Sequence, residues 1–248
     1  MLRFEYKYFF PVAKLDKLRA IISPFMEVDK HAKEHGGQYT VRSIYFDTPD
    51  FDCYFDKMAG VKRRNKVRLR GYNGDGEAGT VFFEIKKKVD EPLYKNRAPT
   101  TYGEAKQILE GEPVENFIEL TEKTPLAQDN ARRFMYHLHA RRMQPVVTVI
   151  YEREPYQAIL KDVDNDLRIT FDKNLRAVAY PDPEDLFEEK CPVPVDGQHF
   201  IMEIKFNRYL PTWVKAVVNT FGLTKGPASK YVLSVDAMHL AGFKWLNG

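Results

Sequence analysis

The stretch Lys66-Val67-Arg68-Leu69-Arg70 alternates a basic with an apolar residue at every position. In a β-strand successive side chains point to opposite faces, so the basic side chains would share one face and the apolar ones the other. A turn sequence, Asn73-Gly74-Asp75-Gly76, comes next, and Phe83-Glu84-Ile85-Lys86-Lys87-Lys88 then repeats the alternation. The two runs predict an antiparallel hairpin over about residues 65–72 and 79–88, with one charged face.

The same alternation predicts charged faces on further strands. We expect strands at about residues 2–10, 39–47, 146–157, 166–172, 175–180 and 198–207. Apolar residues occupy the intervening positions, so each strand would turn one face toward a core. The charged positions are Arg3, Glu5 and Lys7 in the first strand, Arg168 and Asp172 in a later one, and Glu203 and Lys205 in the last.

Apolar stripes with helical spacing predict helices at about residues 12–22, 125–143, 211–221 and 231–240, and partly helical structure over 101–123. Loops are expected at 29–38, 89–99 and 181–197, where polar, glycine or proline residues gather. The amphipathic helices would cover the apolar outside of a sheet that closes on itself. The predicted fold is therefore α+β, with one domain over residues 1–248: a closed antiparallel β-barrel, or tunnel, with a basic lumen, surrounded by α-helices.

The overall composition restricts the possible partners. The net charge of the 248 residues is only +3, so we expect no nucleic-acid partner, since the basicity is local. Cys53 and Cys191 are the only cysteines, and two isolated cysteines are typical of free thiols in a reducing compartment. The first residues lack a signal-peptide core, and no apolar run is long enough for a membrane span. We expect a soluble cytoplasmic protein without direct membrane insertion.

The charged faces indicate a site for phosphates. Arg68 and Arg70 are two residues apart, so their guanidinium forks would lie roughly 6.5–7 Å apart and could contact adjacent phosphates. Lys95 and Arg97 could extend this patch. Glu203, with Glu5 as a second candidate, could bind Mg²⁺ or Mn²⁺. The alternative is a solvated strand face with ordinary salt bridges, and these residues alone do not exclude it.

Common catalytic signatures are absent from the sequence. It has no glycine-rich loop of the Walker or Rossmann kind and no Cys-x-x-Cys pair. His137 and His139 are two residues apart in a predicted helix and would face different ways, whereas a metal pair needs a spacing of four. Phosphate chemistry in this chain would therefore not use the common nucleotide-binding folds.

Eight short motifs follow one another in the order of a known family. They are Arg3-Phe-Glu-Tyr-Lys7-Tyr8, Ser43-Ile-Tyr-Phe-Asp47-Thr48, Lys66-Val-Arg68-Leu-Arg70, Phe83-Glu84-Ile-Lys86, Tyr151-Glu-Arg153, Arg168-Ile-Thr-Phe-Asp172, Met202-Glu203-Ile-Lys205-Phe and Ser229-Lys230-Tyr231. Over essentially its whole length the chain resembles the polyphosphate polymerase domain of the vacuolar transporter chaperone (VTC). That domain belongs to the triphosphate tunnel metalloenzyme (CYTH-like) superfamily.

The resemblance implies a tunnel of antiparallel strands in which the terminal phosphate of ATP, or of another nucleoside triphosphate, is transferred to polyphosphate or inorganic phosphate. Mn²⁺ or Mg²⁺ would be the cofactor, held by Glu203, with Glu5 as the second candidate that the strand pattern offers. The residues implied in catalysis are Arg68, Arg70, Lys86 and Lys230. Those implied in substrate binding are Lys7, Arg68, Arg70, Lys86, Lys95, Arg153, Arg168, Lys205, Ser229 and Lys230.

One departure from the superfamily pattern bears on the reaction. The hydrolase and cyclase branches begin with Glu-x-Glu-x-Lys, whereas this chain has Arg3 at the first of those positions. One metal-binding carboxylate is thereby lost, which favours the polymerase-like branch. A tripolyphosphatase or nucleoside triphosphatase, and a non-catalytic polyphosphate-binding module, remain the alternatives.

Overall fold

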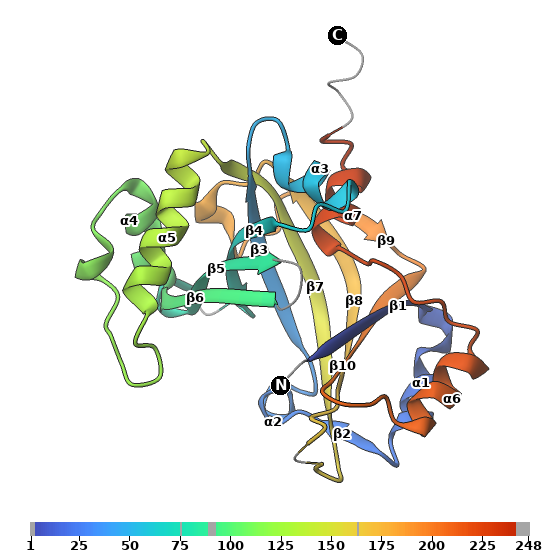
Figure 1. Ribbon diagram of the computed structural model, residues 1–248. Helices are drawn as coiled ribbons and strands as arrows, with labels where there is room; N and C mark the ends of the chain where they lie inside the picture. Colours follow the sequence, from blue (N-terminus) through green and yellow to red (C-terminus); the bar gives the residue numbers. More distant parts are fainter. Residues whose placement is uncertain (1–2, 75, 89–92, 163, 242–248) are drawn as a thin grey trace. The chain divides into compact units, whose positions relative to one another are not determined.

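The computed structural model describes residues 3–74, 76–88, 93–162 and 164–241. Figure 1 shows the elements in chain order. They are β1 (Phe4–Pro11), α1 (Leu15–Ile22), β2 (Met26–Val28), α2 (Lys30–Lys33), β3 (Tyr39–Asp47), α3 (Asp52–Met58), β4 (Arg64–Tyr72), β5 (Thr80–Lys88), β6 (Leu93–Thr101), α4 (Tyr102–Glu110), α5 (Ala127–Ala140), β7 (Gln144–Ala158), β8 (Arg168–Ala179), β9 (Val193–Asp196), β10 (His199–Phe206), α6 (Thr212–Thr220) and α7 (Lys230–Ala237).

The strands pair in the order β1-β10-β8-β7-β3-β4-β5-β6, with β2 on β7 and β9 on β8. The pairs β1–β10, β10–β8, β3–β4, β4–β5 and β5–β6 are all antiparallel. The α+β class and the antiparallel hairpin are thus confirmed. The predicted closed barrel is wrong: over the described ranges, no pairing joins β1 to β6.

A loop segment contacts the outer edge of β1. The amide of Gly226 donates a hydrogen bond of 3.0 Å to the carbonyl of Lys7, and Tyr8 forms an isolated antiparallel bridge with Lys225. Backbone groups at a sheet edge need partners, and here a loop segment supplies them in place of another strand.

The chain folds as two compact units. The first comprises the described parts of residues 1–40, 151–176 and 194–230, and the second those of 41–150, 177–193 and 231–248. The second part of β7 and most of β8 thus belong to the first unit, while β3 from residue 41 and all of β4, β5 and β6 belong to the second.

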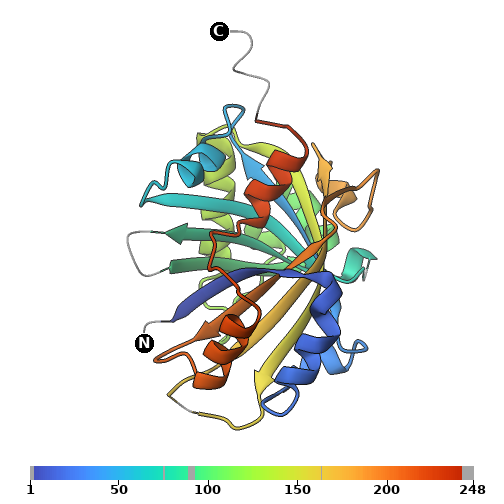
Figure 2. The same cartoon turned by 90° about the vertical axis from the view of Figure 1, so that its right-hand side faces the viewer.

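The core of the first unit lies between α1, α6 and the apolar face of its strands. Phe10 and Phe171 each lie 5.2 Å from Phe200 between ring centroids, and Leu18 of α1 and Val214 of α6 are buried in the same cluster. Figure 2 shows α1 in blue and α6 in orange-red on this unit. The apolar positions of the alternating strands therefore face helices, as the sequence predicts.

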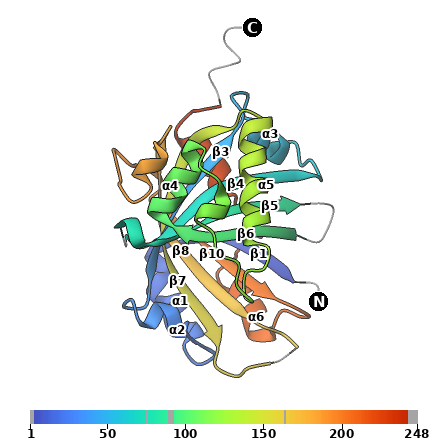
Figure 3. The same ribbon diagram turned by 90° about the vertical axis from the view of Figure 1, so that its left-hand side faces the viewer.

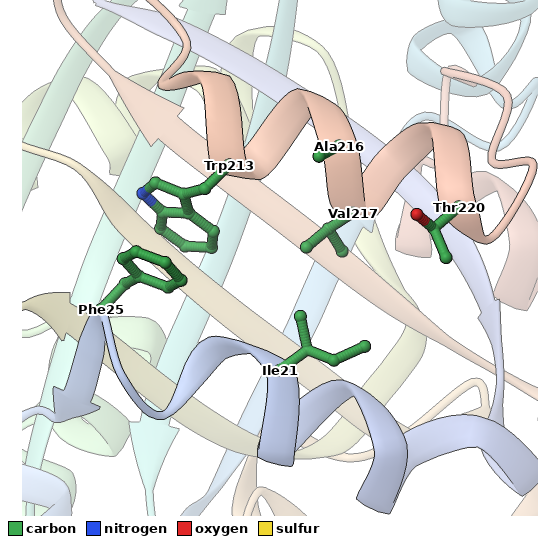
Figure 4. Close-up of a pocket in the computed structure, with 6 residues that line it drawn as sticks. All are labelled: Ile21, Phe25, Trp213, Ala216, Val217 and Thr220. Carbon is green, nitrogen blue, oxygen red and sulfur yellow. The ribbon is translucent and has the colours of Figure 1, made fainter.

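A small apolar pocket opens between α1 and α6. It is lined by Ile21, Phe25, Trp213, Ala216, Val217 and Thr220, and Figure 4 shows the ring of Trp213 over that of Phe25. The two rings are stacked, with centroids 4.5 Å apart. The lining carries no charged side chain, so it does not suit a phosphate.

The core of the second unit lies between α5 and the apolar face of β4, β5 and β6. Phe134 of α5 is fully buried, and its ring centroid lies 4.8 Å from that of Phe83. Val67 and Leu69, which alternate with the basic residues of the opening motif, are buried in the same cluster. Figure 3 shows α4 and α5 over the strands of this unit.

Four sequence expectations need correction. The loop expected at 29–38 contains α2, with Asp29 as its N-cap. Residues 93–101 form β6 rather than a loop; Pro99 is tolerated because β6 is an edge strand. The two strands expected at 166–172 and 175–180 are one strand, β8, which passes through Asn174 at a positive φ of 49°. The loop at 181–197 contains β9. Asp75, in the predicted turn, lies outside the described residues.

Candidate functional site

Charged side chains gather on the polar strand face of the first unit. We call this set the Glu203 cluster: Glu5, Lys7, Arg153, Asp172, Glu203, Lys205 and Lys230. Antiparallel pairing of β1 with β10 places Lys7 opposite Glu203 and Glu5 opposite Lys205. Lys7 Nζ lies 2.9 Å from Glu5 Oε1 and 3.4 Å from Glu203 Oε2. Both predicted metal-binding carboxylates thus meet at one ammonium group.

Burial and neighbouring charges together set the protonation states of Glu203 and Lys7. Burial favours the protonated form of Glu203, but Lys7 and Lys205 outweigh it and hold the pKa of Glu203 well below its ordinary value. Burial would lower the pKa of Lys7, yet Glu203 and Glu5 raise it. Glu203 and Lys7 are therefore both charged at neutral pH. Lys205 Nζ adds a contact of 2.6 Å to Glu203 Oε1.

A second carboxylate of the cluster, Asp172 on β8, is fully buried between two cations. Arg153 Nε and Nη2 donate to its two oxygens at 2.7 and 2.8 Å, and Lys230 Nζ lies 2.5 Å from Oδ2. Burial raises the pKa of Asp172, but Arg153 and Lys230 lower it below its ordinary value. The ring centroid of Tyr151 lies 4.7 Å from Lys230 Nζ and 5.3 Å from Arg153 Cζ. This arrangement holds two of the predicted phosphate-binding cations in fixed positions.

The second unit carries a different arrangement, which we call the Glu84 cluster: Arg68, Arg70, Glu84, Lys95 and Arg97. Glu84 on β5 lies in register with Arg68 on β4 and Arg97 on β6. Arg68 contacts Glu84 Oε2 through Nε and Nη2 at 2.8 and 2.6 Å. Lys95 Nζ and Arg97 Nε lie 2.8 and 3.1 Å from Oε1, and Arg70 Nη1 lies 4.0 Å from Oε2.

Polar side chains of β3 hold the two arginines of the opening motif. Arg68 Nη1 donates to Tyr45 Oη at 2.8 Å, and Arg70 Nε donates to Ser43 Oγ at 3.0 Å. Burial would raise the pKa of Tyr45, but the positive charges of Arg68, Arg70 and Lys66 lower it to about 7. Sequence reasoning missed both β3 residues, although their alternation in Ser43-Ile-Tyr45 was a signal for one shared face.

The remaining predicted residues lie at the margins of these clusters. Lys86 lies in register between Lys66 and Lys95, two residues from Glu84 on the same face of β5. Ser229 is buried and directly precedes Lys230. Arg168 lies directly opposite Lys205 in the β8–β10 register, but its side chain is half exposed and pairs with Asp166 at 3.2 Å.

The carboxylates of the first unit fit a divalent cation of the hard type. Over the described residues no group of three or more His, Cys, Asp or Glu could hold a metal. Glu5 and Glu203, however, both contact the Lys7 ammonium, so an ion held by these two carboxylates would lie beside that group. Mg²⁺ is usually bound by one or two carboxylates together with substrate phosphates. The donor set thus suits an ion that completes its coordination with phosphate oxygens and water.

In the part of the chain that is described, no helix is long and apolar enough to cross a membrane.

The sequence of the chain matches a known protein family. The family model of the VTC domain matches residues 2–239. Subunit 2 of the vacuolar transporter chaperone complex of Saccharomyces cerevisiae is 26% identical over 171 residues, which are 62% of this chain and 20% of that protein. The chain thus spans about a fifth of the length of this relative.

A solved structure also aligns with the chain. It is described as a putative adenylyl cyclase, HpAC1, from Hippeastrum with a dominant triphosphatase activity. The TM-score is 0.43 at 16% identity, with 94% of each chain covered.

Proposed function

This chain belongs to the VTC domain family, and we propose that it is a metal-dependent phosphotransferase that adds the terminal phosphate of a nucleoside triphosphate to polyphosphate. The observation that carries the proposal is the charge balance of the Glu84 cluster. Four cationic side chains surround one carboxylate, which leaves an excess of three positive charges. An excess of this size suits a ligand with several negative charges close together, such as a linear phosphate chain.

The chain's own residues would act by positioning and charge neutralisation. The forks of Arg68 and Arg70 match phosphate oxygens, and the β3 partners keep the forks in place. Asp172 holds Arg153 and Lys230 in the same way. Lys7 keeps Glu5 and Glu203 together, where a bound Mn²⁺ or Mg²⁺ would offset charge on phosphate oxygens.

The transfer itself needs no protein nucleophile. An oxygen of the acceptor phosphate attacks the terminal phosphorus of the nucleotide, a new P–O bond forms, and the bond to the bridging oxygen breaks. The nucleoside diphosphate leaves with that oxygen, so the chain gains one phosphate and the donor loses one. Fixed cations that stabilise the charge on the transferred group are the main contribution of a protein to such a reaction.

An assay with purified protein, ATP and Mn²⁺ tests the proposal. We expect polyphosphate to appear on a gel in step with the release of ADP, and Arg70→Ala and Glu203→Ala each to lower the rate at least tenfold. Arg142→Ala, on a surface turn after α5, is the matched control and should leave the rate unchanged. Absence of polyphosphate, with nucleotide turnover equal in all variants, would refute the proposal.

Hydrolysis of a triphosphate is the second candidate, favoured by the presence of Glu5 beside Glu203. A second carboxylate at the metal position offers a further oxygen for the ion, or a group to accept a proton from water. The same assay separates the two reactions, because hydrolysis consumes short phosphate chains and releases inorganic phosphate. A non-catalytic module would bind polyphosphate without metal-dependent turnover.

A further inference from the structure

Glu84 is the point on which the cations of the second unit converge. Its side chain is 1% exposed, and it lies at the centre of three paired strands, with Arg68 on one side and Arg97 on the other. The cations around it hold its pKa below the ordinary value, although burial alone would raise it. Glu84 is therefore a buried anion among side chains that we propose to bind anions.

The contacts of Glu84 determine the orientation of its neighbours. Both donors on one edge of the Arg68 guanidinium point to Glu84 Oε2, which leaves Nη1 on Tyr45. Arg97 is held on three sides: by Glu84 Oε1, by the ring of Phe82 at 3.3 Å from Cζ to the centroid, and by Tyr72 Oη at 3.3 Å from Nη2. Long side chains lose much entropy when they are ordered, so this order favours binding if it exists before the ligand arrives.

Glu84 also affects the charge state of Lys95. Burial lowers the pKa of Lys95, and so do the charges of Arg97 on its own strand and Arg68 on β4, whereas the ion pair with Glu84 raises it. Lys86 lies directly opposite Lys95 on β5 and is a further cation on that face. Among these neighbours, Glu84 is the one that favours the protonated lysine.

We infer that Glu84 is a positioning residue that holds Arg68, Lys95 and Arg97 as one preformed array for the phosphates of the substrate. It would not touch the reacting atoms. The effect on turnover rests on the proposed function, whereas the effect on anion binding does not. A buried ion pair is weak evidence that Glu84 stabilises the fold, because well-packed apolar side chains often give equal stability. Orienting the three cations, in contrast, requires a carboxylate.

The test compares Glu84→Gln with wild type, using tripolyphosphate without metal as the probe and calorimetry between pH 6.5 and 9.5. Near pH 7 we expect an affinity within about threefold of wild type, since loss of the carboxylate charge offsets loss of order. Tyr45, whose pKa is lowered to about 7 and which contacts Arg68, would also change the charge of the cluster in this range, so both proteins carry Tyr45→Phe in this measurement. As pH rises, binding should then weaken at least one pH unit earlier with Glu84→Gln than without it, because Lys95 loses its proton more readily. In the ATP assay, kcat should fall at least tenfold with KM changed less than threefold.

Matched variants separate positioning from folding. Glu77→Gln replaces an exposed glutamate of the same unit, which pairs with Lys106, and should leave all three readouts unchanged. Glu84→Asp keeps the charge and should restore most of the pH dependence. If Glu84→Gln does not fold, Lys95→Met serves instead and, in the same Tyr45→Phe background, should reduce the alkaline loss of tripolyphosphate binding.

The outcomes distinguish this inference from the proposed function. If the wild type turns over ATP and the Glu84→Gln variant has the same pH dependence and the same kcat, the inference about Glu84 is wrong and the phosphotransferase proposal still stands. Lys95→Met with an unchanged alkaline loss in the Tyr45→Phe background also overturns it. A shifted pH dependence without any turnover in the wild type supports the positioning role and refutes the phosphotransferase proposal.

Discussion

Arg153 and Asp172 form a two-point ion pair, in which Nε and Nη2 of the arginine contact separate oxygens of a fully buried carboxylate at 2.7 and 2.8 Å. Lys230 contacts the same carboxylate from another part of the chain. The sequence predicts Asp172 only as one residue of a charged strand face. In the structure its carboxylate contacts both Arg153 and Lys230 and orients them.

Asp172→Ala should therefore destabilise the protein by about 3–5 kcal/mol, because it leaves the side chains of Arg153 and Lys230, which are only 15% and 9% exposed, without their counter-charge. Urea unfolding followed by circular dichroism measures the change. Asp166→Ala, at a carboxylate that is 42% exposed and pairs with Arg168, should cost less than about 1 kcal/mol. Equal effects of the two substitutions would contradict the anchoring role.

Acid should weaken the protein through Glu203. The folded-state pKa of this group lies below the ordinary 4.5, so its stabilising contribution is complete above that pH and is lost as pH falls toward the folded value. We expect the free energy of unfolding to decline below about pH 4.5, and to decline less steeply in Glu203→Gln. Parallel pH curves for the two proteins would show that Glu203 has no such shift.

Tyr45 should ionise near neutral pH, since its pKa is lowered from 10 to about 7. A spectrophotometric titration at the phenolate absorption should show one early phenol, absent from Tyr45→Phe and retained in Tyr136→Phe, at an exposed tyrosine. The ionised form contributes stability above pH 10 that is lost as pH falls through 7. A wild-type titration that begins only near pH 10 would rule this out.

Removal of the Phe134 ring on α5 should open a cavity in the second unit. Phe134→Ala removes a fully buried side chain that contacts Phe46 and Phe83, at an expected cost of about 3–5 kcal/mol. Leu126→Ala, at a leucine that is 60% exposed, is the control and should cost less than about 0.5 kcal/mol. The midpoint of thermal unfolding provides the measurement, and a similar midpoint for both variants would contradict the packing described.

Much of the fold could be predicted because it depends on local geometry. The alternation in Lys66-Val67-Arg68-Leu69-Arg70 requires basic and apolar side chains to lie on opposite faces of any strand that the segment forms. The buried Val67 and Leu69, and the contacts of Arg68 and Arg70 with Glu84 on the other face, follow from that period. The helix at α6 likewise follows from its apolar stripe and from the glycine that ends it, Gly222, at a φ of 62°.

The sequence by itself thus determined which residues share the charged face of each strand, because side chains two residues apart in any strand point to the same side. Only the tertiary structure decided which carboxylate meets which cation, for example that Arg168, opposite Lys205 in register, pairs with Asp166. It also decided that, over the described residues, no strand pairing joins the two ends of the sheet at β1 and β6. Register and edge pairing depend on hydrogen bonds between distant segments, and no local pattern records them.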